Sequence, residues 1–255
     1  MSKLFDLTGR TALVTGASAG LGQHFARTLV AQGAAVAVTA RRGDRLKTLV
    51  AEIVAGGGKA VAIDMDVADG TSIRAGFATA EAALGPLDIV VNNAGISIVK
   101  PAIDMPEADW DAVMNTNLRG AWLVAQTAGQ AWRAAKRPGS LINIASILGL
   151  RTIGQVAPYN ASKAGLIHLT SVLGMEWARY NIRVNAIAPG YIETEMNAPF
   201  WKTPAGEKLI QRVPQRRIGV PGDLDGALLL LASDAGAFMT GTCITVDGGH
   251  TVNPV

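Results

Sequence analysis

The stretch Leu13-Val14-Thr15-Gly16-Ala17-Ser18-Ala19-Gly20-Leu21-Gly22 decides the fold of this chain. It follows the apolar run 11–14 and opens a helical pattern over 21–31, so we predict a strand, a glycine-rich turn and a helix. Glycine permits a sharp turn and a close approach of the backbone to a ligand. The N–H groups at the start of the helix favour a pyrophosphate. The spacing G-x-x-x-G-x-G differs from the usual G-x-G-x-x-G of dinucleotide sites, but the strand, turn and helix together indicate a phosphate-binding turn.

Short apolar or β-branched runs alternate with longer amphipathic stretches along the rest of the chain. This alternation predicts a parallel sheet with helices on both faces, joined by right-handed crossovers. No internal repeat, low-complexity tract or linker interrupts it. We expect strands near 11–15, 35–40, 60–65, 87–91, 139–145, 182–188 and 243–246.

The composition fits one globular α/β domain. The chain has 255 residues, of which 49 % are apolar and 17 % are charged, as expected for tightly packed helices over a buried sheet. We therefore expect a single domain over residues 1–255. The net charge of +3 is too small, and the Lys and Arg residues are too scattered, to indicate nucleic acid as a partner.

Cysteine, histidine and hydropathy patterns bear on location and metal content. The single cysteine, Cys243, excludes an internal disulfide and fits a reducing cytoplasm. The N-terminal segment lacks an apolar signal core, and the longest aliphatic run, 227–232, is too short to span a bilayer. His24, His168 and His250 are far apart in the sequence without clustered Cys or acidic ligands, so we expect no metal site.

Tyr159 and Lys163 place a phenol and an ammonium one helical turn apart, on the same helix face. The cation would favour the phenolate and lower a pKa that is ordinarily near 10, which suits a general acid. Just upstream, the run 141–145 predicts a buried strand ending at Ser146, and ligands of open α/β sheets bind at the carboxyl ends of strands. Taken alone, the pair is also typical of a half-exposed helix, and Ser146 of a strand terminus.

Together these motifs resemble the classical short-chain dehydrogenase/reductase family over nearly the whole chain. The resemblance implies a single Rossmann-like, doubly wound, parallel sheet of seven strands. Asn92-Asn93-Ala94-Gly95 resembles the family's sheet-stabilising motif, Asp66-Val67 its adenine-binding pair, and Pro189-Gly190 with Thr194 its nicotinamide-side loop. The expected cofactor-binding residues are Gly16, Ser18, Ala19, Gly20, Leu21, Gly22, Arg41, Arg42, Asp66, Val67, Asn93, Ala94, Gly95, Tyr159, Lys163, Pro189, Gly190, Ile192 and Thr194.

The same resemblance implies a catalytic tetrad of Asn117, Ser146, Tyr159 and Lys163. Hydride would pass between a nicotinamide and a carbonyl carbon, while Tyr159 gives a proton to the oxygen and Ser146 holds that oxygen. Lys163 would lower the pKa of Tyr159 and bind the cofactor ribose. Asn117 would order a water that relays protons from Lys163, and its neighbour Asn115 is expected to be structural.

The end of the second expected strand bears on cofactor choice. An NAD-preferring site places an acid there for the ribose hydroxyl, but this chain has Ala40, and the next acid, Asp44, resembles a helix N-cap. Arg41 could pair with a 2′-phosphate, so we expect NADP(H). Many NADP-dependent members carry a basic residue where this chain has Ala19; Ser18 could contribute a hydroxyl instead, and NAD(H) stays the alternative.

The substrate region is the stretch 191–217, which predicts a lid over the pocket; the alternative is a surface excursion with a few core anchors. The residues that flank the catalytic groups predict a mostly apolar pocket, which favours a medium-sized ketone or secondary alcohol over a sugar acid. The expected substrate-binding residues are Ser146, Leu148, Gln155, Tyr159, Tyr191, Met196, Phe200 and Trp201.

Three other functions stay open. A 3-oxoacyl-carrier-protein reductase would have an acidic partner, for which Arg133, Lys136, Arg137 and Arg179 could form a docking surface. A polyol or sugar dehydrogenase would work in the oxidative direction. A cofactor-binding sensor without catalysis is the alternative from another class, and the intact tetrad argues against it.

The resemblance also implies a homo-oligomer that binds a small-molecule carbonyl or alcohol. Tetramers are common in the family, so we expect a homotetramer, with a homodimer as the alternative. The candidate interface elements are 226–232, 243–246 and 250–255.

Overall fold

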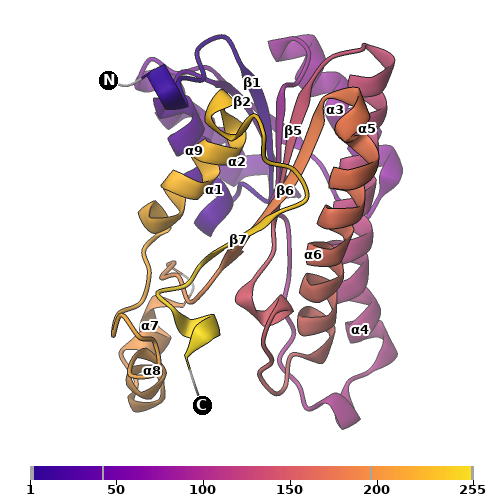
Figure 1. Ribbon diagram of the computed structural model, residues 1–255. Coiled ribbons are helices and arrows are strands. Elements are labelled where there is room, and N and C mark those ends of the chain that lie inside the picture. The colour runs from indigo at the N-terminus through magenta and orange to yellow at the C-terminus, as the bar shows by residue number, and fades with distance from the viewer. Residues whose placement is uncertain (1–2, 42, 196, 254–255) are drawn as a thin grey trace.

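The protein folds into a seven-stranded parallel sheet between two layers of helices, in the order β3-β2-β1-β4-β5-β6-β7 (Figure 1). The computed structural model describes residues 3–41, 43–195 and 197–253. The expected fold class is confirmed, and all seven expected strands are present with ends shifted by two residues at most. The strands are β1 (Thr11–Thr15), β2 (Ala35–Ala40), β3 (Ala60–Asp64), β4 (Ile89–Asn92), β5 (Gly139–Ile144), β6 (Ile182–Pro189) and β7 (Cys243–Val246).

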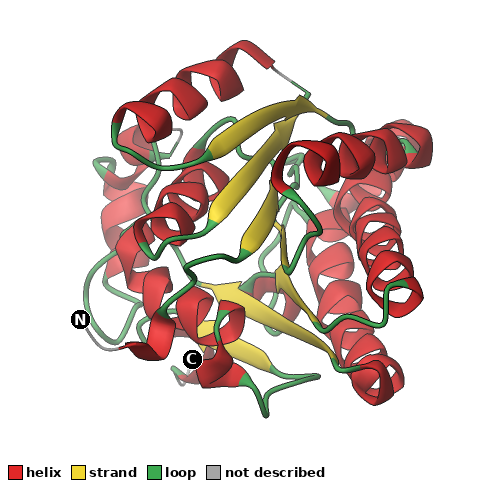
Figure 2. Ribbon diagram, turned by 90° about the horizontal axis from the view of Figure 1, so that it is seen from above, coloured by secondary structure: helices red, strands yellow, loops and turns green. Residues whose placement is uncertain are grey.

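Both faces of the sheet are buried, as parallel sheets require. Side chains of one strand point alternately to the two layers: Val36 and Val38 of β2 join one apolar core, whereas Ala37 joins the other. Figure 2 shows the twisted sheet enclosed by helices on either side. One layer holds α1 (Gly20–Ala31), α2 (Gly43–Ala55) and α9 (Asp225–Ala232). The other holds α3 (Gly70–Leu84), α4 (Glu107–Met114), α5 (Ala121–Ala134) and α6 (Ala157–Trp177).

The chain between β6 and α9 leaves the sheet at the carboxyl ends of the strands. It carries the short helices α7 (Ala198–Trp201) and α8 (Pro204–Ile210), which lie beside the C-terminal turn in Figure 1. The Asn253 side chain donates a hydrogen bond of 2.7 Å to the carbonyl of Arg212, so the two segments are joined. Among the ranges described above, no helix has the length and apolarity needed to cross a bilayer.

Candidate active site

The glycine-rich turn between β1 and α1 is a cradle that side chains would fill. Gly16 has a φ of +66°, and a Cβ there would lie 2.8 Å from the Cα of Ala94. A Cβ on Gly22 would lie 2.5 Å from the carbonyl oxygen of Gly16. Glycine at these positions leaves the first N–H groups of α1 open to an anionic group, so the turn fits a dinucleotide. Ser18 and Ala19 lie in the same turn, and Gly20 and Leu21 begin α1.

Thr15 and Asn93 hold this cradle in place. The N–H groups of Asn93 and Ala94 both donate to the Thr15 hydroxyl at 2.9 Å. The Asn93 side-chain amide donates to the carbonyl oxygens of Thr15, at 2.9 Å, and of Gly16, at 3.3 Å. The segment after β4 is therefore fixed against the turn. Sequence reasoning missed Thr15, although a hydroxyl at the last position before a glycine turn is a readable signal.

Ser146, Tyr159 and Lys163 come together at the carboxyl end of β5. Ser146 follows that strand, is buried, and accepts a hydrogen bond of 3.1 Å from the Leu148 N–H. Its side chain is also hydrogen-bonded to Tyr159. Lys163 Nζ lies 5.6 Å from the centroid of the Tyr159 ring and donates to the Ile144 carbonyl at 2.8 Å. The three predicted side chains thus share one site, two on α6 and one at the strand end.

Burial governs the titration of the tyrosine and the lysine. Burial raises the pKa of Tyr159, and the hydrogen bond with Ser146 only partly opposes it. Burial also lowers the pKa of Lys163 to about 8. The expected lowering of the Tyr159 pKa by Lys163 is therefore wrong for this structure, because removing the phenolate from water outweighs that attraction. At neutral pH the phenol is protonated, as a proton donor must be.

Asn117 lies in a π-helical turn, Asn115–Gly120, between α4 and α5. Such turns recur at functional sites because they re-aim side chains within a helix. The buried Asn117 amide accepts from the Ile96 N–H at 2.8 Å and donates to the Ile96 carbonyl at 2.9 Å and the Ser162 hydroxyl at 3.2 Å. Asn115, its sequence neighbour, is exposed. Asn117 therefore ties the segment after β4 to the turn of α6 that carries Lys163.

Gly95 brings this segment close to the catalytic lysine. A Cβ on Gly95 would lie 3.3 Å from Asn117 Oδ1 and 3.6 Å from Lys163 Nζ. Gly149, which sequence reasoning missed, has a similar role on the other side, since a Cβ there would lie 2.7 Å from the Lys163 backbone carbon. The turn that follows Ser146 can therefore pack directly on α6.

The predicted adenine side lies at the ends of β2 and β3. Asp66 accepts from the Ala68 N–H at 2.9 Å, and Val67 is buried. Arg41 is exposed just after β2, whereas Arg42 lies outside the described residues.

The register of β2 and β3 also places an acid there. It pairs Ala40 with Asp64, whose carboxylate reaches Gly43 at the start of α2. Sequence reasoning missed this acid because it considered only the strand that ends at Ala40.

The predicted nicotinamide-side loop folds over the start of α1. Pro189 ends β6, and the Gly190 N–H donates to the Val246 carbonyl at 2.9 Å. The Thr194 methyl group lies 3.7 Å from where a Cβ on Gly20 would be, and Ile192 is buried. The loop and the glycine cradle therefore form two sides of one groove.

A pocket opens beside Ser146, between the turn after β5, the loop after β6, α8 and the C-terminal turn. Two arginines and a histidine contribute to its walls, beside the apolar side chains that the sequence led us to expect. Their positions could not be read from the sequence, since they come from segments up to about a hundred residues apart. The lining residues are Ile147, Leu148, Arg151, Thr152, Ile153, Tyr191, Leu209, Arg212, His250 and Asn253.

The other predicted substrate residues have different places. Trp201 is buried and its ring lies 5.4 Å from that of Tyr191, while the exposed Phe200 ring packs on Trp201 at 5.0 Å. Gln155 is exposed, and its carbonyl accepts from the Lys100 N–H at 2.7 Å; it is not among the residues that line the pocket. Met196 lies outside the described residues.

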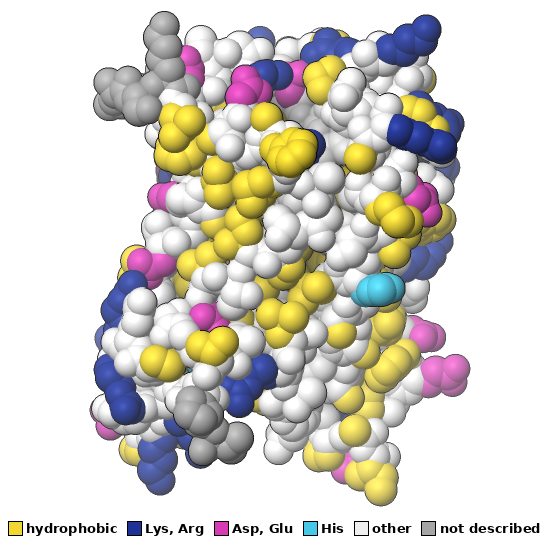
Figure 3. Space-filling model, in the orientation of Figure 1, with side chains coloured by type: hydrophobic (Ala, Val, Ile, Leu, Met, Phe, Trp, Pro, Cys, Tyr) yellow, Lys and Arg dark blue, Asp and Glu magenta, His cyan; other side chains and the backbone are white. Residues whose placement is uncertain are grey.

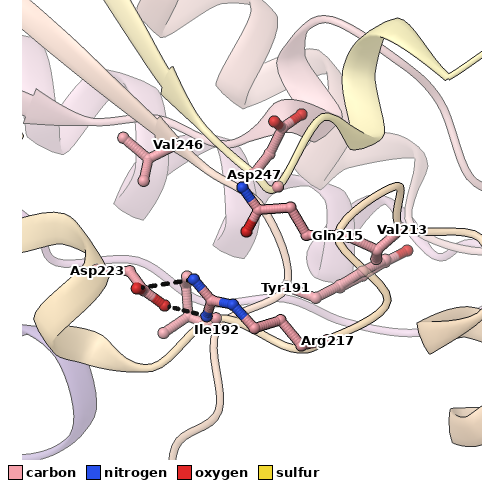
Figure 4. A pocket seen from close by; sticks show the side chains of 10 residues that line it. Tyr191, Ile192, Val213, Gln215, Arg217, Asp223, Val246 and Asp247 are labelled. Atoms are coloured by element: carbon pink, nitrogen blue, oxygen red, sulfur yellow. Dashed lines mark hydrogen bonds and ion pairs between the residues drawn. The ribbon is translucent and has the colours of Figure 1, made fainter.

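Tyr191 also borders a second pocket, between the end of β7 and the segment 213–219. Figure 4 shows the Arg217 guanidinium paired with the Asp223 carboxylate among the residues that line it. Their two hydrogen bonds, of 2.6 and 3.0 Å, neutralise the guanidinium. Within the part of the chain that the structure describes, no three metal-ligating side chains come together in either pocket or elsewhere.

A protonated phenol hydrogen-bonded to a serine, with a buried lysine beside it, can pass a proton to or from an alcohol oxygen. The glycine cradle next to it fits the pyrophosphate of a nicotinamide dinucleotide. The fold and the site define an NAD(P)-dependent oxidoreductase that interconverts alcohols and ketones.

The family model described as enoyl-(acyl carrier protein) reductase matches residues 16–251. The chain belongs to the classical short-chain dehydrogenase/reductase family. This is an enzyme family, and the reading as a sensor without catalysis is set aside.

Relatives match over the full length of the chain. An NAD-dependent glycerol dehydrogenase of Listeria innocua is 35 % identical, over 98 % of this chain and 97 % of its own. The structure of a short-chain type dehydrogenase/reductase from Mycobacterium marinum has a TM-score of 0.92 and 40 % identity, and 98 % of each chain is covered. A gluconate 5-dehydrogenase from Burkholderia cenocepacia, in complex with NADP and tartrate, has a TM-score of 0.93 and 37 % identity, again over 98 % of each chain.

Proposed function

We propose that this protein interconverts a secondary alcohol and a ketone on a polyol-like or sugar-like substrate, with NADP(H) as the preferred cofactor. The observation that carries this proposal is the meeting of Ser146, Tyr159 and Lys163 beside the glycine cradle. The relatives named for glycerol and gluconate support the substrate class. This class was an alternative to the medium-sized ketone in the sequence analysis.

Proton transfer is the work of Tyr159 and Ser146. The bound dinucleotide would supply or accept the hydride at the substrate carbon. Ser146 holds the substrate oxygen by a hydrogen bond, and the Tyr159 hydroxyl donates its proton to that oxygen in the reductive direction. Because burial raises the pKa of Tyr159, the donor stays protonated at neutral pH. In the oxidative direction the Tyr159 phenol must first lose its proton to solvent, and the phenolate then accepts the proton of the alcohol.

Lys163 supports the phenolate that forms after proton transfer. Its ammonium is held by the Ile144 carbonyl and lies 5.6 Å from the centroid of the Tyr159 ring, within range of charge stabilisation. A pKa of about 8 leaves it mostly protonated at pH 7. Asn117 is a positioning residue that fixes Ser162, the residue before Lys163, through a bond of 3.2 Å.

The preference for NADP(H) rests on the exposed Arg41 and on the absence of an acid at Ala40 itself. The Burkholderia cenocepacia relative was solved with NADP. Asp64 beside Ala40 and the NAD-dependent relative of Listeria innocua favour the alternative.

The test is an assay of the purified protein with NADPH and, separately, NADH against ketones, ketosugars and 3-oxoacyl thioesters, with the reverse reaction on the matching alcohols. We expect turnover of polyol-type pairs, and faster turnover with NADPH. Turnover of thioesters alone would refute the substrate class, and faster turnover with NADH would refute the cofactor preference.

A 3-oxoacyl-carrier-protein reductase is the second candidate, favoured by the description of the matching family model. Of the expected basic docking residues, Arg137 pairs with Asp88 at 2.8 Å, whereas Arg179 stacks on the Tyr180 ring at 4.9 Å, keeps its charge and lines one hollow with Arg133. Charge reversal of Arg133 and Lys136 would impair reduction of carrier-linked substrates alone if this surface binds the carrier.

We also propose a cytoplasmic homotetramer that folds as one domain, with residues 191–217 as a lid over the pocket. The edge strand β7 is only partly buried, and Met175 of α6 is exposed. Apolar side chains gather on the face in Figure 3 where Figure 1 places α9 and β7. Light scattering should give four times the protomer mass of 26.4 kDa; twice that mass would indicate a homodimer.

A further inference from the structure

The pocket beside Ser146 is lined by residues that follow this serine in the chain. Ile147 and Leu148 follow Ser146 directly and form one wall, and the Leu148 N–H donates to the Ser146 hydroxyl at 3.1 Å. Tyr191 and Leu209 belong to the segments on the other side. The pocket therefore adjoins Ser146 along the chain, and its lining begins with the residue that follows Ser146.

Arg151 is fixed in the wall of this pocket. Its backbone N–H donates to the Ile147 carbonyl at 2.8 Å, which places the residue one turn beyond Ser146. Its Nη1 donates to the carbonyls of His250, at 2.6 Å, and Asn253, at 3.3 Å. These acceptors are uncharged, so the guanidinium keeps its full positive charge, and its remaining N–H groups have no acceptor among the described residues.

Arg212 brings a second positive charge to the same pocket. It follows α8 and is exposed, and its backbone is joined to the C-terminal turn, because its carbonyl accepts from the Asn253 side chain at 2.7 Å. In the ranges that the structure describes, neither arginine forms an ion pair. No Asp or Glu is among the described residues that line the pocket. Arg217 in the neighbouring pocket differs from these two arginines, because Asp223 neutralises its charge (Figure 4).

The positive charges of Arg151 and Arg212 both act on His250. Burial lowers the pKa of this histidine, and the positive charges of Arg151 and Arg212 lower it further, against the opposing Asp247. Its ring packs edge-on against Tyr191, at 5.2 Å between centroids, and its buried Nδ1 has no hydrogen-bond partner within the described part of the chain. The pocket thus combines two cations that have no carboxylate partner among the described residues, an arrangement that an anion would neutralise.

We infer that the substrate of the proposed reaction carries a carboxylate, which Arg151 and Arg212 bind while the reacting oxygen lies at Ser146. The inference rests on the proposed function and specifies its substrate class. Guanidinium groups form paired hydrogen bonds with carboxylates, and two of them in the wall of one pocket, Arg151 half-buried and Arg212 exposed, favour an acid over a neutral polyol of the same length. This inference is the opposite of the preference for a ketone or secondary alcohol over a sugar acid that the sequence indicated.

The experiment compares matched acid and neutral substrates. Gluconate and glucitol are oxidised with NADP+, and 4-oxopentanoate and its methyl ester are reduced with NADPH. In wild-type protein we expect the acid of each pair to have a kcat/KM at least about tenfold higher, since a hydrogen bond to a charged group contributes about that factor or more.

Variants assign the effect to the two arginines. Arg212→Gln should lower kcat/KM for the acids by about tenfold, mainly through KM, and the double variant with Arg151→Gln by about a hundredfold. The neutral substrates should change by less than about threefold. In the double variant, Arg151→Lys in place of Arg151→Gln should recover part of the kcat/KM lost on the acids. Arg74→Gln, an exposed arginine on α3 that bonds only to Thr71, is the matched control and should behave as wild type.

A binding measurement separates this inference from the proposed function. Calorimetry with glutarate, an unreactive dicarboxylate, and protein loaded with NADPH should show binding that the double variant loses. Turnover of both members of each pair with equal kcat/KM, an equal loss on both in the variants, or a thioester preference lost in the same variants would overturn the carboxylate site. Glutarate binding without any turnover would retain the site and refute the proposed reaction.

Discussion

Tyr159 and Lys163 lie one helical turn apart on α6, yet burial shifts both of their pKa values toward the uncharged forms. At neutral pH, Tyr159 is therefore a neutral phenol beside the cation of Lys163, whose pKa is about 8. The hydrogen bond with Ser146 orients the phenol. Replacement of the hydroxyl removes proton transfer and leaves the cradle for the dinucleotide intact.

Tyr159→Phe should lower kcat by about 10²- to 10⁴-fold, the usual contribution of general acid catalysis. Fluorescence titration should show unchanged NADPH binding. Tyr180→Phe is the matched control, since Tyr180 contacts Arg179 away from the pocket beside Ser146. Turnover of Tyr159→Phe at the wild-type rate would exclude this residue as the proton donor.

Arg41 and Asp64 test cofactor choice, because they lie at the ends of neighbouring strands with opposite charge. Arg41→Ala should lower kcat/KM for NADPH by about tenfold, the effect of one charge-assisted contact, and leave NADH nearly unchanged. Asp64→Asn should shift the ratio of the two kcat/KM values further toward NADPH, because a carboxylate repels the 2′-phosphate. If both variants leave the ratio unchanged, these residues do not face the ribose.

At the scale of elements, the sequence predicted the strands, the glycine turn and the helix start because each depends on neighbours along the chain. It did not predict contacts made by register and packing. Asp64 lies beside Ala40 only because β3 pairs with β2. Arg151, Arg212 and His250 meet only because three separate segments close on one pocket. Local patterns carry no information on such distant pairs.

A substitution in the turn between β1 and α1 tests how closely the atoms of the glycine cradle are packed. Gly22→Ala would put a methyl group 2.5 Å from the Gly16 carbonyl and 2.6 Å from the Asn93 amide, so the start of α1 must move. We expect a stability loss of about 1–3 kcal/mol and at least tenfold weaker NADPH binding, measured by urea unfolding and fluorescence titration.

Gly70→Ala is the matched control, because Gly70 also lies in the first turn of a helix and a Cβ there would meet only the flexible end of Arg74, at 3.3 Å, and Leu123, at 3.9 Å. It should be neutral or slightly stabilising, since alanine favours helix more than glycine does. Equal effects of the two substitutions would mean that the cradle is not close-packed.

At the scale of the whole molecule, the buried lysine of the active site lowers the free energy of unfolding at neutral pH. Lys163 is a buried cation whose pKa falls from 10.5 to about 8 on folding. Below pH 8 the folded and unfolded chains are both protonated at this residue. Between pH 8 and 10.5 the unfolded chain binds more protons, so the free energy of unfolding rises with pH. Over the full window the gain is about 3 kcal/mol.

Cys243 acts in the opposite direction, because burial raises the pKa of its thiol from 9.0 to about 11. Above pH 9 the unfolded chain loses this proton first, so stability falls as pH rises. The raised pKa of Tyr159 has the same sign above pH 10. The stability of the wild-type protein should therefore rise from pH 8 to 9 and then level off.

Urea unfolding from pH 7 to 10, at one protomer concentration, separates the two groups. Lys163→Met should remove the rise between pH 8 and 9 and leave a decline above pH 9, since only the thiol then titrates. Cys243→Ala should let the rise continue to pH 10. The comparison uses slopes rather than absolute stabilities, so the lost hydrogen bond from Lys163 to Ile144 does not confound it. Parallel curves for wild type and Lys163→Met would show that the lysine is not a buried cation in solution, and its proposed support of the Tyr159 phenolate would then have to be abandoned.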